Sequence, residues 1–140
     1  MAKKATPFSN ITVLDFSRYL PGGYATQVLA DLGAEVIKVE DTGLGDFMRH
    51  DYPTMGGGIS YYITALGRNK KSVSLNLKDS EVVDWFLKMA KEADVIVESF
   101  RPGVTAKLGI DYETVKAINP RIIYCSISGY GATDPAVICQ

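Results

Sequence analysis

A pair of adjacent glycines, Gly22 and Gly23, stands between two apolar segments in "ITVLDFSRYLPGGYATQVLADLGAEVIKVE". A glycine turn between a strand and a helix, followed by a second strand that ends in an acid such as Glu40, is the outline of a dinucleotide-binding unit. The full fingerprint needs a third glycine shortly afterwards, and none follows within three residues. The pattern predicts a nucleotide-like ligand and argues against NAD. Glu40 also has the plain alternative of a solvated residue.

Two further segments carry groups that suit a phosphorylated ligand. The segment "GRNKKS", residues 67–72, gathers Arg68, Lys70 and Lys71. Such a cluster is either a solvated basic turn, which is the default, or a phosphate contact, because cationic side chains pair well with phosphate oxygens. In "SFRPG", Phe100 could stack on a base or belong to the core.

The sequence lacks the residues or motifs that several other kinds of chemistry require. His50 is the single histidine, and it lies in the glycine-rich segment 41–58, where we expect a loop. Neither a G-x-S-x-G elbow nor a phosphate-binding P-loop motif is present. The two cysteines have no metal-ligand spacing, and we expect no metal; Cys125, inside "RIIYCSIS", is expected to be a buried thiol. Carboxylates are available, but nothing in their spacing indicates a pair for acid–base catalysis. They are Asp15, Glu40, Asp46 and Asp51.

The elements that must position these groups alternate between strand-like and helix-like segments. Strands are expected at 11–17, 35–40, 94–99 and 121–128, with a weaker one at 72–77. The helices between them have caps at Asp79 or Ser80 and at Asp111, and Gly33 ends the first. The first helix is expected to face the core through Ala25, Val28, Leu29 and Leu32.

This alternation predicts an α/β fold, a Rossmann-like, doubly wound and mostly parallel sheet with helices on both faces. Strands of such sheets are buried on both sides. The residues that we expect to be buried are Val13, Val36, Ile37, Ile96, Ile122 and Ile123. Ligands of open α/β sheets bind beyond the carboxyl ends of the strands. Here those ends lead into "SRYLPGG", "EDTG", "NLKD", "SFRPG" and "SGYG", which we expect to form one rim.

Composition limits the class of protein. The 140 residues suffice for one domain, expected at 11–140 behind a short tail at 1–10. The 15 basic and 16 acidic residues nearly cancel, which argues against a nucleic-acid partner. No apolar stretch approaches the length of a membrane span, and the N-terminus lacks the apolar centre of a signal peptide. We therefore expect a cytoplasmic protein with no membrane partner.

Four motifs in order, "VLDFSRYLPGGYATQVLADLGAEVIKVED", "GRNKKSVSLNLK", "ADVIVESFRPGVTAKLGIDYE" and "NPRIIYCSISGYG", resemble the family III CoA-transferases. That family includes L-carnitine dehydratase, bile-acid-inducible protein F, formyl-CoA transferase and the α-methylacyl-CoA racemases. The resemblance covers about residues 11–130. It implies that the paired glycines help to hold coenzyme A. It also implies coenzyme A contacts at Leu20, Pro21, Leu75, Asn76, Leu77, Lys78, Ser99, Phe100, Arg101, Lys107, Ser128, Gly129, Tyr130 and Gly131.

Two of these motifs depart from the family pattern. Ser99 stands where asparagine is usual, and Asp41 stands where some members have arginine. A carboxylate repels phosphate, so no phosphate role is carried over to Asp41.

The resemblance also implies an activity. Family transferases move coenzyme A from an acyl-CoA thioester to a carboxylic acid through a covalent aspartyl intermediate, and that aspartate is expected beyond Gln140. We therefore expect an N-terminal, truncated coenzyme A-binding portion, inactive by itself, of an enzyme whose full-length form is an interlocked homodimer. The alternatives are a racemase or a carnitine-dehydratase-type member of the family, and a stand-alone CoA- or nucleotide-binding module without catalysis.

Overall fold

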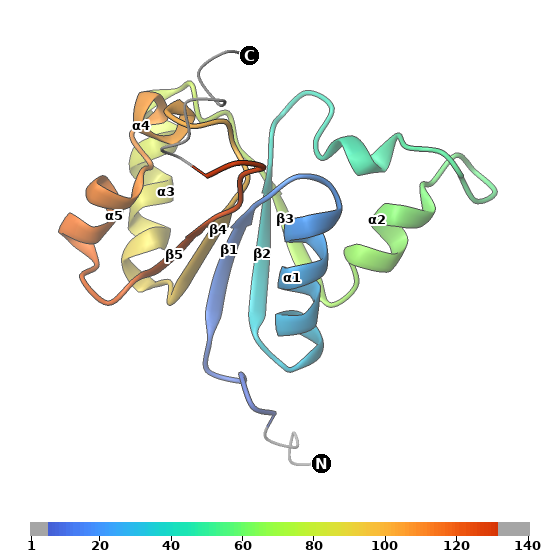
Figure 1. Ribbon diagram of the computed structural model, residues 1–140, viewed down its shortest axis with the longest axis horizontal. Coiled ribbons are helices and arrows are strands. Elements are labelled where there is room, and N and C mark those ends of the chain that lie inside the picture. Colours follow the sequence, from blue (N-terminus) through green and yellow to red (C-terminus); the bar gives the residue numbers. More distant parts are fainter. Residues whose placement is uncertain (1–5, 132–140) are drawn as a thin grey trace.

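Figure 1 shows the computed structural model of the chain, which describes residues 6–131. Its centre is a five-stranded sheet in which every neighbouring pair of strands is parallel. The strand order is β3-β2-β1-β4-β5, so the chain builds the sheet outward from β1 in both directions. The strands are β1 (Thr12–Phe16), β2 (Glu35–Glu40), β3 (Lys70–Ser74), β4 (Val95–Glu98) and β5 (Ile123–Ser126).

Helices cover both faces of this sheet, with α1 on one side and α3 and α5 on the other (Figure 1). Their bounds are α1 (Tyr19–Asp31), α2 (Tyr61–Leu66), α3 (Ser80–Glu92), α4 (Val104–Leu108) and α5 (Tyr112–Ile118), with a short 3-10 helix η1 (Phe47–Arg49). No helix among residues 6–131 is both long and apolar enough to cross a bilayer.

Each face of the sheet carries its own core. Val13 of β1 packs with Ala30 of α1, whereas the next residue, Leu14, joins the core that contains Phe86 of α3 and Val115 of α5. Because successive side chains of a strand point to opposite faces, burial on both faces requires a continuous apolar run rather than an alternating one. This arrangement confirms the predicted doubly wound fold.

The predicted helix caps are present. The Asp79 side chain accepts a hydrogen bond from the amide of Glu81, and the Asp111 side chain accepts one from the amide of Thr114. Gly33, just past α1, has a φ of 104°, a conformation that suits glycine after a helix.

Helix α1 differs from the prediction in both its start and its orientation. It begins at Tyr19, so the two glycines belong to its first turns rather than to a turn that precedes it. Its predicted apolar face was wrong at Ala25, Val28 and Leu32, which are exposed, whereas Leu29 packs against the core as predicted. The buried residues of α1 are instead Gly22, Gly23, Thr26, Gln27 and Ala30. Small residues allow the helix backbone to approach the sheet, and polar ones meet buried charges beneath it.

The edge strand β5 also differs from the prediction. Val13, Val36, Ile96 and Ile122 are buried as expected, but Ile37 is only partly buried and Ile123 is 63% exposed. Cys125, expected to be buried, is also exposed. Both exposed residues lie on β5, and α1 packs over β1 and β2 instead (Figure 1). A short apolar run indicates a buried strand only in the middle of a sheet, and nothing in the run itself reports an edge. Cys139 lies outside the described residues.

Candidate functional site

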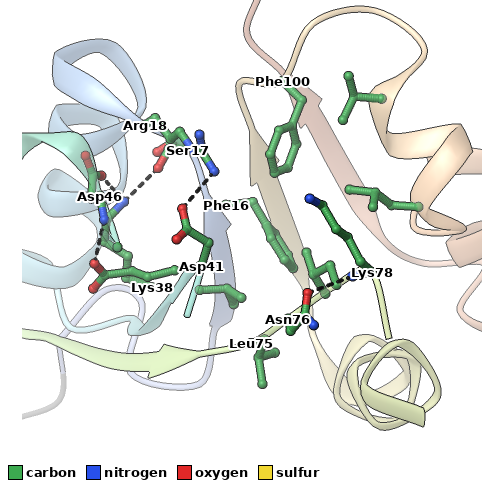
Figure 2. A pocket seen from close by; sticks show the side chains of 16 residues that line it. Phe16, Ser17, Arg18, Lys38, Asp41, Asp46, Leu75, Asn76, Lys78 and Phe100 are labelled. Atoms are coloured by element: carbon green, nitrogen blue, oxygen red, sulfur yellow. Dashed lines mark hydrogen bonds and ion pairs between the residues drawn. The ribbon is translucent and has the colours of Figure 1, made fainter. Parts of the chain in front are cut away.

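A pocket of about 310 Å³ opens at the carboxyl ends of β1, β2, β3 and β4. It lies where the chain switches from building the sheet on one side of β1 to building it on the other, the usual ligand position in such folds. Figure 2 shows its lining. The residues are Phe16, Ser17, Arg18, Lys38, Val39, Glu40, Asp41, Gly45, Asp46, Leu75, Asn76, Leu77, Lys78, Phe100, Val104 and Leu108.

One side of this pocket is mainly apolar. Phe16 at the end of β1 and Phe100 after β4 line it together with Leu75 of the segment after β3 (Figure 2). Lys78 ends that segment, and its side chain extends toward the space between the two phenylalanine rings. Apolar walls with a few convergent polar groups are typical of small-molecule sites. Five of the residues named by the family resemblance meet here, namely Leu75, Asn76, Leu77, Lys78 and Phe100.

The opposite side carries an ion pair between two loops. Arg18, two residues past the end of β1, places a guanidinium nitrogen 3.2 Å from a carboxylate oxygen of Asp41, directly after β2 (Figure 2). The guanidinium also lies 5.0 Å from the ring centre of Phe47 and 5.7 Å from that of Phe100. These rings add a cation–π attraction to the ion pair with Asp41.

Two buried lysines and two buried aspartates lie beneath the turn formed by Ser17 and Arg18, which we call the pocket turn. They are Lys38, Lys70, Asp15 and Asp46, and their side chains are at most 4% exposed. Lys38 of β2 places its Nζ 2.7 Å from an Asp46 oxygen and donates to the Ser17 carbonyl oxygen, also at 2.7 Å. Lys70 donates to Asp15 at 3.1 Å. Because two cations face two anions, the cluster is neutral as a whole, which makes the burial of the charges tolerable.

This buried cluster fixes the pocket turn to the helix and the sheet. Asp15 accepts hydrogen bonds from the amide of Ser17 and the hydroxyl of Thr26 in α1. Lys70 also donates to the carbonyl oxygen of Gly23 and to Thr26. Burial lowers the pKa of Lys70, and the neighbouring Asp15 acts against that shift. The spacing of the carboxylates gave no sign of this cluster; a lysine in the middle of the apolar run "EVIKVE" is the signal that could have found it.

Glu40 is not a solvated residue, so that interpretation of it was wrong. Its carboxylate side chain is 2% exposed and accepts hydrogen bonds from Arg49, from the hydroxyl of Ser72 at 2.6 Å and from the amide of Asp46 at 2.8 Å. Burial by itself would raise the pKa of Glu40, but these hydrogen bonds outweigh it and lower that pKa to about 2.

This lowered pKa predicts a pH dependence. A carboxyl group whose pKa is lower in the folded protein stabilises it fully above the unfolded-state pKa of 4.5, and that contribution is lost as the pH falls toward 2. The shift corresponds to about 3 kcal/mol. We expect Glu40→Gln to lower the free energy of unfolding at pH 7 and to flatten its decline between pH 4.5 and pH 2.

Urea denaturation across that pH range measures both effects. The matched control is Asp31→Asn. The pKa of Asp31 is also lowered to about 2, chiefly by the hydrogen bond from Arg68. Because that pair lies at the surface, the loss of stability in Asp31→Asn should be small. Equal losses from the two variants would contradict the buried position of Glu40.

The basic segment "GRNKKS" is a solvated turn at Arg68, as the default interpretation predicted, but its Lys70 side chain is buried. Lys70 and Lys71 belong to β3, which begins two residues earlier than expected. Arg68 is paired with Asp31, and Lys71 is paired with Glu35. With Lys70 buried in the charge cluster, each cation of the segment already has an acidic partner.

The remaining residues named by the family resemblance lie in other places. Leu20 and Pro21 line a second pocket at the start of α1. Ser99 accepts a hydrogen bond from the amide of Arg18 through its Oγ at 2.8 Å, so it fixes the pocket turn. The others are exposed and lie outside both pockets, namely Arg101, Lys107, Ser128, Gly129, Tyr130 and Gly131.

The sequence comparisons match a known enzyme family. The sequence pattern of CoA-transferase family III matches residues 8–137. The acetyl-CoA:oxalate CoA-transferase of Acetobacter aceti is 46% identical over 96% of this chain and 34% of its own length. The human succinyl-CoA:glutarate CoA-transferase is 46% identical over 92% of this chain and 30% of its own length. The chain thus spans about a third of the length of these curated relatives.

Solved structures agree with these relatives. A CAIB/BAIF family protein from Brucella suis superimposes with a TM-score of 0.87 at 40% identity, over 94% of this chain and 36% of its own. The protein Rv3272 from Mycobacterium tuberculosis gives a TM-score of 0.88 at 39% identity, over 94% of this chain and 37% of its own. Sequence and structure together show that the chain belongs to CoA-transferase family III.

Proposed function

We propose that this chain binds coenzyme A in the pocket at the ends of β1 to β4, as part of an enzyme that moves coenzyme A between carboxylic acids. The observation that carries the proposal is the pocket itself, with apolar walls on one side and cations at its mouth. Coenzyme A has a flat base, a chain of phosphates and an amide-bearing arm. The apolar residues suit the base and the arm, and the cations suit the phosphates.

Lys78 is the proposed phosphate contact on the apolar side. Its side chain extends toward the pocket, and it forms no ion pair with any residue among 6–131. Phe16 and Phe100 are placed to contact the base or the arm. Leu20 and Pro21, in the second pocket, are proposed contacts for the more distant part of the ligand.

The proposed reaction follows the family and needs an aspartate outside the 140 residues printed here. The aspartate carboxylate attacks the carbonyl carbon of the donor thioester, the carbon–sulfur bond breaks, and the coenzyme A thiolate leaves an acyl-aspartyl anhydride. The thiolate then attacks the aspartyl carbonyl and releases the donor acid, which gives an aspartyl-CoA thioester. The acceptor carboxylate repeats these steps in reverse order, so each bond broken is matched by one formed. The whole protein is further proposed to be an interlocked homodimer.

Coenzyme A titration tests the proposal. We expect the 140-residue chain to bind coenzyme A with a dissociation constant of roughly 0.1–1 mM, or about 4–5.5 kcal/mol, because part of the binding energy is lost in ordering the rim. Lys78→Ala should weaken binding by about tenfold, since a charge-assisted hydrogen bond contributes about 1.5–3 kcal/mol before solvent screening. Arg101→Ala should weaken it less, because Arg101 lies outside the pocket lining.

Lys88→Ala is the matched control, since it removes the same charge from the exposed surface of α3, away from the pocket. Its affinity for coenzyme A should equal that of the unchanged chain. Tighter binding of NAD than of coenzyme A would contradict the proposal. Acyl-CoA exchange by the 140-residue chain alone would show that the proposed position of the nucleophile is wrong.

A further inference from the structure

We infer that Arg18 is a second phosphate-binding residue, held by Asp41 in the ligand-free protein and released to the ligand on binding, so that Asp41 sets the affinity. The inference rests on the proposed function, because it concerns the same pocket. It assigns roles to two residues outside the coenzyme A contacts that the family resemblance implies.

The charges around the pocket single out Arg18. Six charged residues line it. Lys38 and Asp46 are paired and at most 4% exposed, and Glu40 is paired with Arg49. Lys78 is thus the one lining cation without an ion pair among the described residues. A ligand with several phosphates is bound better by more than one cation, and Arg18 is the other cation of the lining that is not buried.

The Arg18–Asp41 pair is the one that can separate. Its side chains are 35% and 41% exposed, so water screens their attraction and can solvate Asp41 after separation. The Lys38–Asp46 pair cannot separate in the same way, because both groups would remain buried without a partner. Arg18 therefore changes partner at low cost.

The surroundings also keep Arg18 in place when Asp41 is gone. Phe47 and Phe100 lie 5.0 and 5.7 Å from its guanidinium carbon, and Ser99 holds its backbone amide. A guanidinium positioned in this way needs little reordering to meet a phosphate. Asp41 opposes binding twice, because it competes for Arg18 and because its negative charge repels the ligand.

Titrations of single variants test this exchange. We expect Asp41→Asn to tighten coenzyme A binding by about three- to tenfold, and Arg18→Met to weaken it by a similar factor. In the Arg18→Met background, Asp41→Asn should gain less, because only the repulsion is then relieved. Asp84→Asn, which removes the same charge from the exposed surface of α3, is the control and should change nothing.

Two further measurements, with a ligand that lacks phosphate and at high salt, distinguish the exchange of Arg18 between Asp41 and the ligand from a purely structural effect. Pantetheine, which has no phosphate, should bind the wild-type chain and all four variants alike. The gain from Asp41→Asn should shrink at 1 M salt, where screening acts over about 3 Å. Wild-type binding of coenzyme A with no gain from Asp41→Asn, or with an equal gain from Asp84→Asn, would overturn the inference alone. No coenzyme A binding by the folded wild-type chain would overturn the proposed function and the inference together.

Discussion

Replacing Lys38 with methionine is expected to lower the free energy of unfolding by about 3–5 kcal/mol. Methionine has a similar length and fits the space, so the loss comes from charge rather than from packing. In the variant, the Asp46 side chain, which is 1% exposed, remains buried without its cation. The Ser17 carbonyl oxygen also loses the hydrogen bond that Lys38 donates to it. A protein of this size has a total stability of about 5–15 kcal/mol, so the variant should be close to unfolding. Urea denaturation measures the difference.

Lys71→Met is the matched control for this variant. Lys71 lies on the neighbouring strand, and its ion pair with Glu35 is 70% and 50% exposed, so its loss should cost less than about 1 kcal/mol. The double variant Lys38→Met with Asp46→Asn should recover part of the loss, because it removes the uncompensated charge and keeps an oxygen for the amide of Met48. Equal losses from Lys38→Met and Lys71→Met would show that the buried cluster does not stabilise the fold.

Local patterns were enough to predict the fold. The apolar runs at β1, β2 and β4 are too short for helices. They also lack the alternation of a sheet that has one solvent-exposed face, so they predict a parallel sheet that is buried on both faces. The caps at Asp79 and Asp111 depend on contacts two or three residues away, which a sequence displays directly. Strand order and the exposed edge at Ile123 depend on which strand lies beside which, and no local pattern records that.

The site was predictable only where its residues are contiguous. The segments "SRYLPGG", "EDTG", "NLKD" and "SFRPG" were identified by their place after strands, and each contributes residues to the pocket lining, whereas "SGYG" does not; Leu75 was named only by the family resemblance. The buried cluster joins β1, β2, β3 and η1, and a single sequence does not show which side chains meet across such distances. The polar inward side of α1 was missed for the same reason, since Thr26 faces the sheet to reach Asp15 and Lys70. Apolar periodicity predicts the buried side of a helix only when that side is apolar.

Replacing Gly22 with alanine is expected to lower the free energy of unfolding by about 3 kcal/mol and to abolish coenzyme A binding. A Cβ at Gly22 would overlap the Cβ and Oγ of Ser17. The Cβ of Ser17 sits on the backbone and cannot rotate away, so the turn itself must move. Alanine favours a helix by about 1 kcal/mol over glycine, which is less than the cost of such overpacking. The shift displaces Arg18, the next residue in that turn, and disturbs the Ser17 contacts to Lys38 and Asp15.

Gly56→Ala separates this effect from the general cost of replacing a glycine. A Cβ at Gly56 meets nothing within 4 Å, and its backbone is not in the left-handed region, so stability should stay within about 0.5 kcal/mol. Denaturation curves and coenzyme A titrations of the two variants give the comparison. If Gly22→Ala were as stable as Gly56→Ala and still bound coenzyme A, the close approach of α1 to the Ser17 turn would be wrong. Gly22 would then not be the position at which α1 packs closely against Ser17.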